Sequence, residues 1–381
     1  MKSFIRNKKR VKWAVAVLSI FVLVAFFSPF LANDHAIVCK DQNGWSFFTQ
    51  KVGINGFCIQ PVIPYSPQQT DVERYFSTSP LSEQPTLSWR NRHWLGTDKL
   101  GRDVAAGMIH GTKVGLLIGF ISITFAFIFG VSLGMVSAYN KDNGIKFHFI
   151  QVIFGVISIF IIGFYGYYQW QLESFGWWIL ITYLVILIFS NILLNIIIKK
   201  FGWPQNVNFP IDTLLVKAIE VRKSFPGLFI LLALTSLVTS PSVWSIIVII
   251  SLLIWPDFAR YARAETLAVA EENYVVSAKV LGLGHWKILY RHILPNILPT
   301  LTVVACFSIS GALILESSLS FLGLGLPVEQ VTWGKMMAEG RNMYAWWLVV
   351  FPGIALFLIV LSLNTIAEEI NDHQKSFSLD D

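Results

Sequence analysis

The chain has 381 residues, of which 54% are hydrophobic and only 14% are charged, and its mean hydropathy is +0.59. This composition excludes a soluble or disordered protein and is typical of a membrane protein. The net charge of +6 does not require a nucleic-acid partner, because a basic cytoplasmic face accounts for it.

Apolar windows predict about eight transmembrane helices. A bilayer core of roughly 30 Å needs about 20 apolar residues in a helix. The windows that meet this requirement are 13–31, 114–139, 147–168, 178–198, a kinked one within 214–238, 243–258, 297–315 and 345–366.

Residues 1–32 form a cytoplasmic tail and the first transmembrane helix. A basic run precedes this helix, as in a signal peptide, but its apolar stretch is about 19 residues long and lacks a small-x-small cleavage site. We therefore expect a retained anchor.

Residues 33–112 form a long extracytoplasmic segment. The stretch "AIVCKDQNGWSFFTQ" alternates around Asn43–Gly44, which is a hairpin signal and predicts a small β-ribbon. Cys39 and Cys58 lie in this segment, whereas Cys306 lies within a predicted span. An oxidising exterior favours a disulfide between the first two, with two free thiols as the alternative.

Basic residues near the span ends place both termini in the cytoplasm. Residues 113–140 form a transmembrane helix, and residues 141–209 an inserted transmembrane hairpin with Lys199 and Lys200 at its inner end. Because two helices are inserted, the sidedness of all later spans is preserved. The hairpin is almost wholly apolar, so we expect it at the lipid-facing periphery. Residues 367–381 form a cytoplasmic tail.

Residues 210–366 contain a cytoplasmic loop at 259–296. Its charged residues would each cost about 2.5–3.5 kcal/mol at the bilayer centre. The spacing of Leu267, Tyr274, Ala278 and Leu281 predicts one helical face, which Gly282 ends. A second short helix is expected at 285–294, before Pro295. The pattern alone leaves open a solvated connector or a docking element.

"YVVSAKVLG" followed by "RHILPN" resembles the cytoplasmic EAA signature of ABC importer permeases of the dipeptide, oligopeptide and nickel group. Four further stretches agree in order: "HWLGTDKLGRDV", "KSFPGLFILLAL", "ESSLSFLGLGLP" and "WGKMMAEGR". The chain resembles the C-type subunit of this group. The resemblance implies an all-α polytopic fold of type I importer permeases, with a six-helix core to which the hairpin and the ribbon are added.

The resemblance also implies partners and a coupling loop. Such permeases pair with a second homologous permease subunit, two cytoplasmic ATPase subunits and an extracytoplasmic substrate-binding protein. The signature normally begins with Glu, where this chain has Val276; an acidic residue of the preceding turn is the substitute. The residues assigned to coupling are Glu271, Glu272, Tyr274, Ala278, Gly282, Arg291, His292, Leu294 and Pro295.

No catalytic or metal-binding motif accompanies these features. The chain has no GxxxxGK[ST] phosphate loop and no HExxH or paired CxxC motif. We expect no enzyme activity, no metal and no cofactor in this chain, with ATP and Mg²⁺ used by the ATPase subunits. Glu316, at the outer end of a span, is expected at the interface or bonded to nearby backbone, with a substrate role as the alternative.

We expect the chain to be a permease subunit of an ATP-driven importer in the inner (plasma) membrane of a bacterium. It would form half of the translocation pathway for peptides, nickel or a related small solute. The alternative is a secondary transporter or channel acting without an ATPase. That alternative predicts polar residues buried in mid-span, and the windows contain very few.

Overall fold

The computed structural model describes residues 2–41, 44–49, 57–70, 76–85, 87–142, 146–148, 206–238, 242–327 and 329–377, with single positions between 158 and 196. The chain divides into two compact units. The main unit consists of Met1–Met135 and Ala218–Asp381, and the smaller unit of Val136–Lys217.

Long apolar helices build the main unit. Among the described residues, four helical segments are long and apolar enough to cross a membrane: Val104–Asn140, Val243–Val269, His285–Phe321 and Trp346–Gln374. The first two are α4 and α9. The third joins α11 (His285–Ile288), the π-helical turn η2 (Leu289–Ile293) and α12 (Leu294–Phe321). The fourth is within α14 (Trp346–Phe377).

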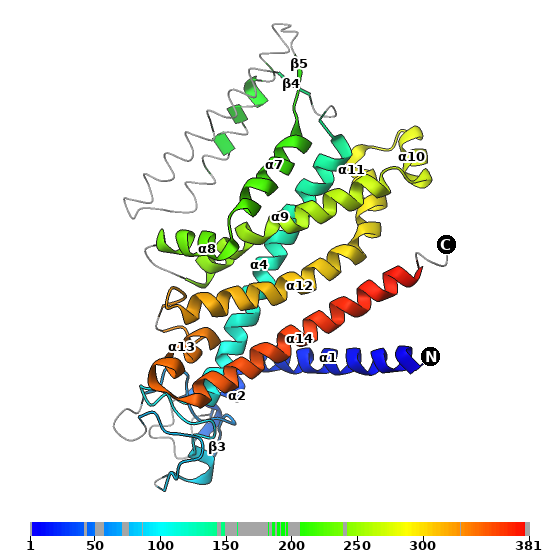
Figure 1. Cartoon of the computed structure of the whole chain (residues 1–381). Coiled ribbons are helices and arrows are strands. Elements are labelled where there is room, and N and C mark those ends of the chain that lie inside the picture. The colour runs from blue at the N-terminus through cyan, green and yellow to red at the C-terminus, as the bar shows by residue number, and fades with distance from the viewer. Residues whose placement is uncertain are drawn as a thin grey trace. The chain divides into compact units, whose positions relative to one another are not determined.

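The core lies between α9, α12 and α14. Figure 1 shows α14 running beside α12 and α1 (Lys2–Phe26), and α14 is in contact with both. Phe258, Leu301, Leu313 and Ile359 are fully buried there. By contrast, α1 exposes large apolar side chains, including Phe26 at 75%, as a helix bounded by lipid does. The short α2 (Ser28–Leu31) completes the predicted first span.

The kinked span predicted within 214–238 is two helices, α7 (Ile211–Ser224) and α8 (Gly227–Ser236). Pro226 stands at the N-cap of α8, and the residue before a proline is disfavoured in helical geometry. The chain therefore breaks where "KSFPG" stands. The Lys223 ammonium at the end of α7 pairs with the Asp257 carboxylate of α9 at 2.7 Å.

Two glycines bring the main-unit part of α4 against α9. A Cβ atom on Gly130 would lie 2.4 Å from the carbonyl oxygen of Trp255, and one on Gly134 would lie 2.4 Å from that of Ala259. No side chain larger than hydrogen fits at either position. Small residues four apart are the usual device for close helix contact in membranes.

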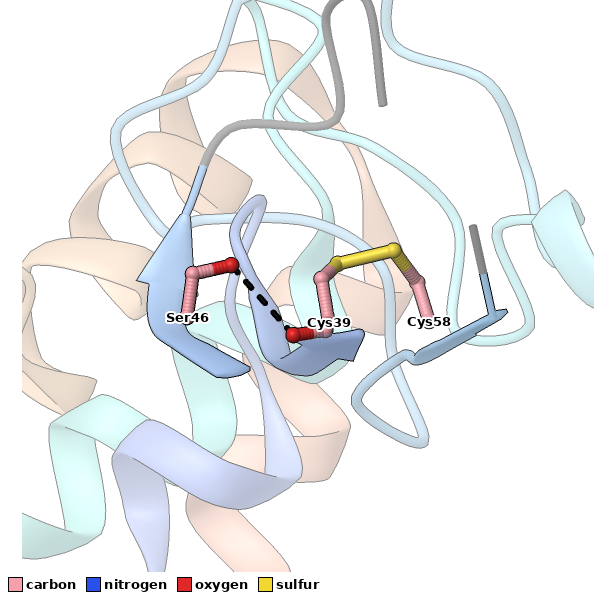
Figure 2. The surroundings of a disulfide bond; sticks show 3 residues. All are labelled: Cys39, Ser46 and Cys58. Carbon is pink, nitrogen blue, oxygen red and sulfur yellow. Dashed lines mark hydrogen bonds between the residues drawn. A yellow bond between two sulfur atoms is a disulfide. The ribbon is translucent and has the colours of Figure 1, made fainter. Parts of the chain in front are cut away.

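The predicted ribbon is a three-stranded antiparallel sheet in the order β2-β1-β3, with β1 at Ala36–Asp41, β2 at Gly44–Thr49 and β3 at Phe57–Ile59. Gly44 pairs with Asp41 as the first residue of β2, so it is a strand residue and not the turn residue that the Asn43–Gly44 signal suggested. Cys39 lies opposite Cys58 in the register and is joined to it by a disulfide (Figure 2). The hydroxyl of Ser46 donates to the carbonyl of Cys39 at 3.4 Å.

The main unit has two distinct ends. Figure 1 shows α10 (Asn273–Val280) and α11 at the end opposite β3. The sheet end holds the β-sheet, the 3₁₀ turn η1 (Trp89–Asn91) and α13 (Trp333–Met343). The loop end holds α10 and α11.

The smaller unit contains an antiparallel pair, β4 (Lys146–His148) and β5 (Asn206–Asn208). The Asp142 carboxylate accepts hydrogen bonds from the backbone amides of Asp212 at 3.1 Å and Thr213 at 3.0 Å. This anchors the start of α7. The strand at 146–148 corrects the prediction of a helix from residue 147. Apart from these strands and single positions, the predicted hairpin spans lie outside the described residues.

Helix boundaries also differ from those predicted. The α4 helix begins at Val104 instead of near 113, α9 continues from 258 to Val269, and α14 runs through most of the predicted tail to Phe377. A hydropathy window ends where side chains become polar. A helix does not have to end there, because its backbone hydrogen bonds are made within the helix itself.

Candidate functional site

At the sheet end, the "GTDKLGRD" stretch folds into a tight turn. The Asp98 carboxylate accepts from the backbone amides of Leu100 at 2.8 Å and Arg102 at 2.9 Å. Gly101 has a positive φ of 70°. Gly96 has a φ of 81°, and a Cβ there would lie 2.5 Å from the carbonyl oxygen of Thr78. Both glycines are therefore required by backbone conformation.

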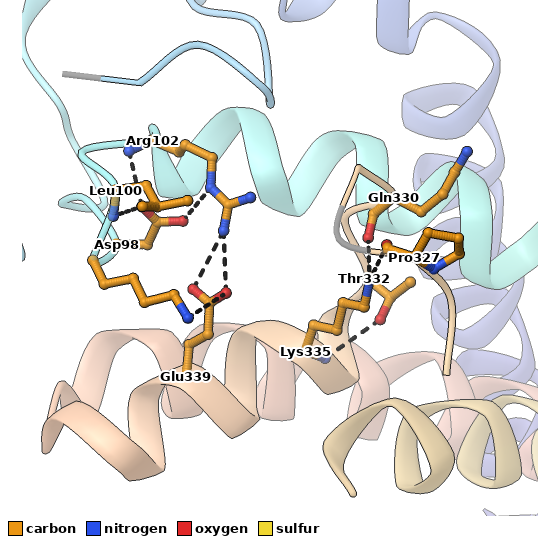
Figure 3. Close-up of polar contacts among 9 residues, drawn as sticks. Asp98, Leu100, Arg102, Pro327, Gln330, Thr332, Lys335 and Glu339 are labelled. Carbon is orange, nitrogen blue, oxygen red and sulfur yellow. Dashed lines mark hydrogen bonds and ion pairs between the residues drawn. The ribbon is translucent and has the colours of Figure 1, made fainter. Parts of the chain in front are cut away.

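This turn directs Arg102 toward α13. Its Nε donates to Asp98 at 2.5 Å, and its Nη2 donates to the two carboxylate oxygens of Glu339 at 3.1 and 3.4 Å (Figure 3). Lys99 adds a longer contact to Glu339 at 3.9 Å. The side chains of Arg102 and Glu339 are 13% and 19% exposed. Two separate sequence motifs thus form one ion-pair network.

A second polar group on α13 is Lys335. Its ammonium donates to the carbonyls of Pro327 and Gln330, in the segment between α12 and α13 (Figure 3). Burial lowers the pKa of Lys335 to about 8. Burial also raises the pKa of the Glu339 carboxyl, and the neighbouring Asp98 raises it further.

Between these groups lies a cavity of about 250 Å³, with Asp98, Arg102, Lys335 and Glu339 in its wall. Glu316, near the end of α12, is 2% exposed. Its carboxylate accepts from the hydroxyls of Ser320 at 2.8 Å and Ser317 at 3.3 Å. The carboxylate of Glu316 is thus bonded by side-chain hydroxyls, whereas the expectation was a position at the interface or bonds to nearby backbone.

A buried histidine–aspartate pair fixes the start of α4. His93 Nδ1 lies 2.8 Å from the Asp103 carboxylate, and both side chains are almost fully buried. The other oxygen of Asp103 accepts from the amide of Ala106 at 2.7 Å, as an N-cap does. Asp103 therefore joins the turn to the helix that follows it.

At the loop end, the connection between α9 and α12 (residues 270–293) has the glycine turn expected from the sequence. Gly282 has a φ of 75°. Its amide donates to the carbonyl of Lys279 at 3.0 Å, and the amide of Leu283 donates to that of Ala278 at 3.2 Å. These two bonds form a Schellman motif that ends α10. A Cβ on Gly282 would meet nothing within 4 Å.

The predicted apolar face of this connection is wrong. The chain leaves helical geometry at 270–272, so Leu267 belongs to α9 and the others to a new helix. Val275 and Ala278 are the buried residues of α10, whereas Tyr274 is 43% and Leu281 80% exposed. The helical period of these apolar residues does not reveal the turn at 270–272 that separates α9 from α10.

The outer surface of the connection carries an exposed apolar group that the sequence pattern missed. We call Val280, Leu281, Trp286 and Tyr290 the loop patch; Val280 is 82% and Trp286 62% exposed. The rings of Trp286 and Tyr290 stack with their centroids 5.9 Å apart. The available signal was the presence of large apolar residues among Lys279, Lys287 and Arg291. The assigned Glu271, Glu272 and Arg291 are also exposed.

The second predicted helix is not a separate element. α11 continues through the π-helical turn η2 into α12, and Pro295 stands in the first turn of α12. A proline has no amide hydrogen and its ring clashes with the carbonyl four residues earlier, so the preceding turn widens. Asn296, next to Leu294 and Pro295, donates to the Tyr274 hydroxyl at 2.8 Å and to the His292 carbonyl at 2.7 Å. This joins α10 to α12.

Residues 201–375 match the family described as binding-protein-dependent transport system inner membrane component. The matched segment includes the 270–293 connection, Glu316 and Glu339, whereas Asp98 and Arg102 lie before it.

Curated relatives extend the similarity over most of the chain. It is 27% identical over 318 residues to the glutathione transport system permease protein GsiD of Pectobacterium atrosepticum, covering 83% of this chain and 80% of the relative. It is 26% identical over 282 residues to the dipeptide transport system permease protein DppC of Alkalihalophilus pseudofirmus, covering 74% and 70%. A putative peptide permease of Brucella suis is 28% identical over 316 residues, covering 81% and 78%.

Among solved structures, the MetNI methionine ABC transporter in its inward facing conformations is similar, with a TM-score of 0.42 and 14% identity over 70% of this chain and 97% of that chain.

Proposed function

We propose that this permease is one of two homologous membrane subunits of a bacterial ABC importer for short peptides. The support is the family match together with relatives whose names specify dipeptide, peptide and glutathione transport. An extracytoplasmic binding protein delivers the solute, and two ATPase subunits bind and hydrolyse ATP with Mg²⁺.

The loop end faces the cytoplasm in this proposal. Lys279, Lys287 and Arg291 are exposed at that end, and basic residues near span ends remain inside. The start of α1 and the end of α14 lie on the same side as α10 in Figure 1, so they are cytoplasmic too. The sheet end, with its disulfide, then faces the oxidising exterior.

The single observation that carries the coupling role is the loop patch. Its four large apolar side chains are 50–82% exposed beside charged residues that keep the connection out of the bilayer. An exposed apolar group of this kind favours a protein partner. We assign that partner as the ATPase, with Gly282 allowing the chain to turn beneath its surface and Glu271 or Glu272 supplying an acidic contact.

The test is reconstitution of the full importer with Val280→Asp and Leu281→Asp combined. We expect normal insertion of the variant but loss of ATPase binding and of solute-stimulated ATP hydrolysis, because charges replace the apolar contact. Leu81→Asp is the matched control, since Leu81 is 83% exposed at the sheet end. Full coupling in the double variant would refute the docking role. Peptide uptake by the chain without ATPase subunits would instead favour a secondary transporter.

A further inference from the structure

A second cavity, of about 580 Å³, lies in the main unit between the end of α7 and helices α9, α12 and α14. Thr300 and Gly311 on α12 both line it. They are 6 and 17 residues from the start of that helix at Leu294, or about 9 and 25 Å along its axis. The cavity therefore extends from near the loop end far into the bundle.

Among the described residues, two donor atoms of side chains in the cavity wall have no hydrogen-bond partner. They are the Nε of Arg222 and the Nε2 of Gln374, and both residues line this cavity. Buried donors are normally bonded, so these atoms mark unsatisfied polar groups within the wall. Both atoms are closed to solvent, and an occupant of the cavity would contact other atoms of the wall.

The charges of the wall are positive in sum. Arg222 and Arg260 both line the cavity, as does Asp257. Lys223 pairs with Asp257 at 2.7 Å, which offsets the negative charge and leaves the two guanidinium groups in excess. Guanidinium groups bind carboxylates and phosphates through paired N–H donors.

Part of the cavity wall is apolar and open. Val303 and Phe307 line it, and a Cβ on Gly311 would meet nothing within 4 Å. The volume is in the range of small-molecule sites, roughly 300–1,000 Å³. A lipid headgroup would need only the guanidinium groups, whereas a short peptide with a terminal carboxylate would use both the guanidinium groups and the apolar part of the wall.

We propose that this cavity is a binding site for the transported solute on its way to the cytoplasm, and that Arg222 and Arg260 bind the carboxylate of a short peptide there. The inference rests on the proposed function for its choice of ligand.

The experiment measures thiol labelling in the whole importer, reconstituted in vesicles with the loop end accessible. Cys306→Ala removes the free cysteine, and Ser308→Cys places one thiol in the cavity wall. We expect anionic sulfonatoethyl methanethiosulfonate to react faster than cationic trimethylammonioethyl methanethiosulfonate. Arg222→Gln and, separately, Arg260→Gln should lower this ratio about tenfold, whereas Arg222→Lys should retain most of it. Lys113→Gln on α4 also removes one positive charge, but away from the cavity wall, and is the control.

A tripeptide with a free carboxylate should slow the labelling at Ser308→Cys, and the same tripeptide with a terminal amide should not. Equal protection by both peptides would overturn the carboxylate assignment. Protection that follows anionic phosphatidylglycerol in the vesicles and ignores the peptide would instead assign the cavity to lipid phosphate. Uptake of the free tripeptide, driven by ATP in the unmodified importer, is measured in parallel. Its absence would count against the proposed function, while the labelling ratios would still test the anion site.

Discussion

Arg102 and Glu339 stand 237 positions apart in the chain and are joined by a hydrogen bond of 3.1 Å. Through this pair the turn before α4 is attached to α13. Asp98 contacts the same guanidinium at 2.5 Å, so one cation serves two carboxylates.

Arg102→Met should lower stability, because Asp98 and Glu339 would then face each other with only the distant Lys99 as a cation. Breaking a buried pair costs roughly 3–5 kcal/mol, and with side chains 13% and 19% exposed we expect about 2 kcal/mol. Thermal unfolding in detergent measures this. Adding Glu339→Gln should recover part of the loss; if the second change made the protein less stable still, the pair would not be the cause.

Gly282→Trp should leave the permease in the membrane and uncouple ATP hydrolysis from transport. The positive φ of 75° strains any other residue, but a Cβ atom at this position would meet nothing within 4 Å. The position is therefore open, and we expect a large side chain there to meet the partner. Gly282→Ala carries the same backbone strain with little bulk and should remain largely coupled. Equal ATPase coupling in the Ala and Trp variants would contradict partner contact at this turn.

Cys39 and Cys58 should be recovered as one bridged peptide pair from native membranes, without reduction. The sequence separation is 19 residues, and closing a loop of this length stabilises by about 3 kcal/mol. Replacing both cysteines with alanine should make the sheet more sensitive to protease while leaving the helices intact. Alkylation of both thiols before any reduction would show that the bond is absent.

The lowered pKa of Lys335 should make the free energy of unfolding increase as the pH rises from about 8 to 10.5. The pKa of Lys335 is about 8 in the folded protein and ordinarily 10.5. Between these values the unfolded chain holds more protons, so the free energy of unfolding rises with pH. Lys335→Met should remove this rise. The difference in unfolding midpoint between wild type and variant, followed from about pH 7 to about pH 10, measures it; a difference that is constant over this range would contradict the shifted pKa.

Local patterns in the sequence were sufficient for several features. The apolar windows locate α4, α9, α12 and α14, since each window reflects burial or lipid contact within one helix. The cap at Gly282 was also predictable, because a Schellman motif is set by residues close in the chain.

Features that depend on distant contacts or on hidden turns were not predictable. Nothing near Arg102 in the sequence points to Glu339, because only the folded bundle brings them together. The exposed position of Leu281 was missed because the helical period was extended through 270–272, where the chain turns. The π-helical turn before Pro295 follows from proline chemistry. The same proline is also compatible with a complete break in the helix, so the sequence does not decide between the two.

The contact of Gly130 and Gly134 with the backbone of α9 has a mechanical consequence. Two helices whose backbones touch cannot slide past each other without separating first, so the main-unit part of α4 and the part of α9 around Trp255 and Ala259 should move together. α9 continues to Val269, next to α10, and α4 begins at Val104, next to Arg102. A displacement of α10 should therefore pass through this contact toward the end where Arg102 binds Glu339, apart from bending of α9 at Pro256, which lies inside the helix.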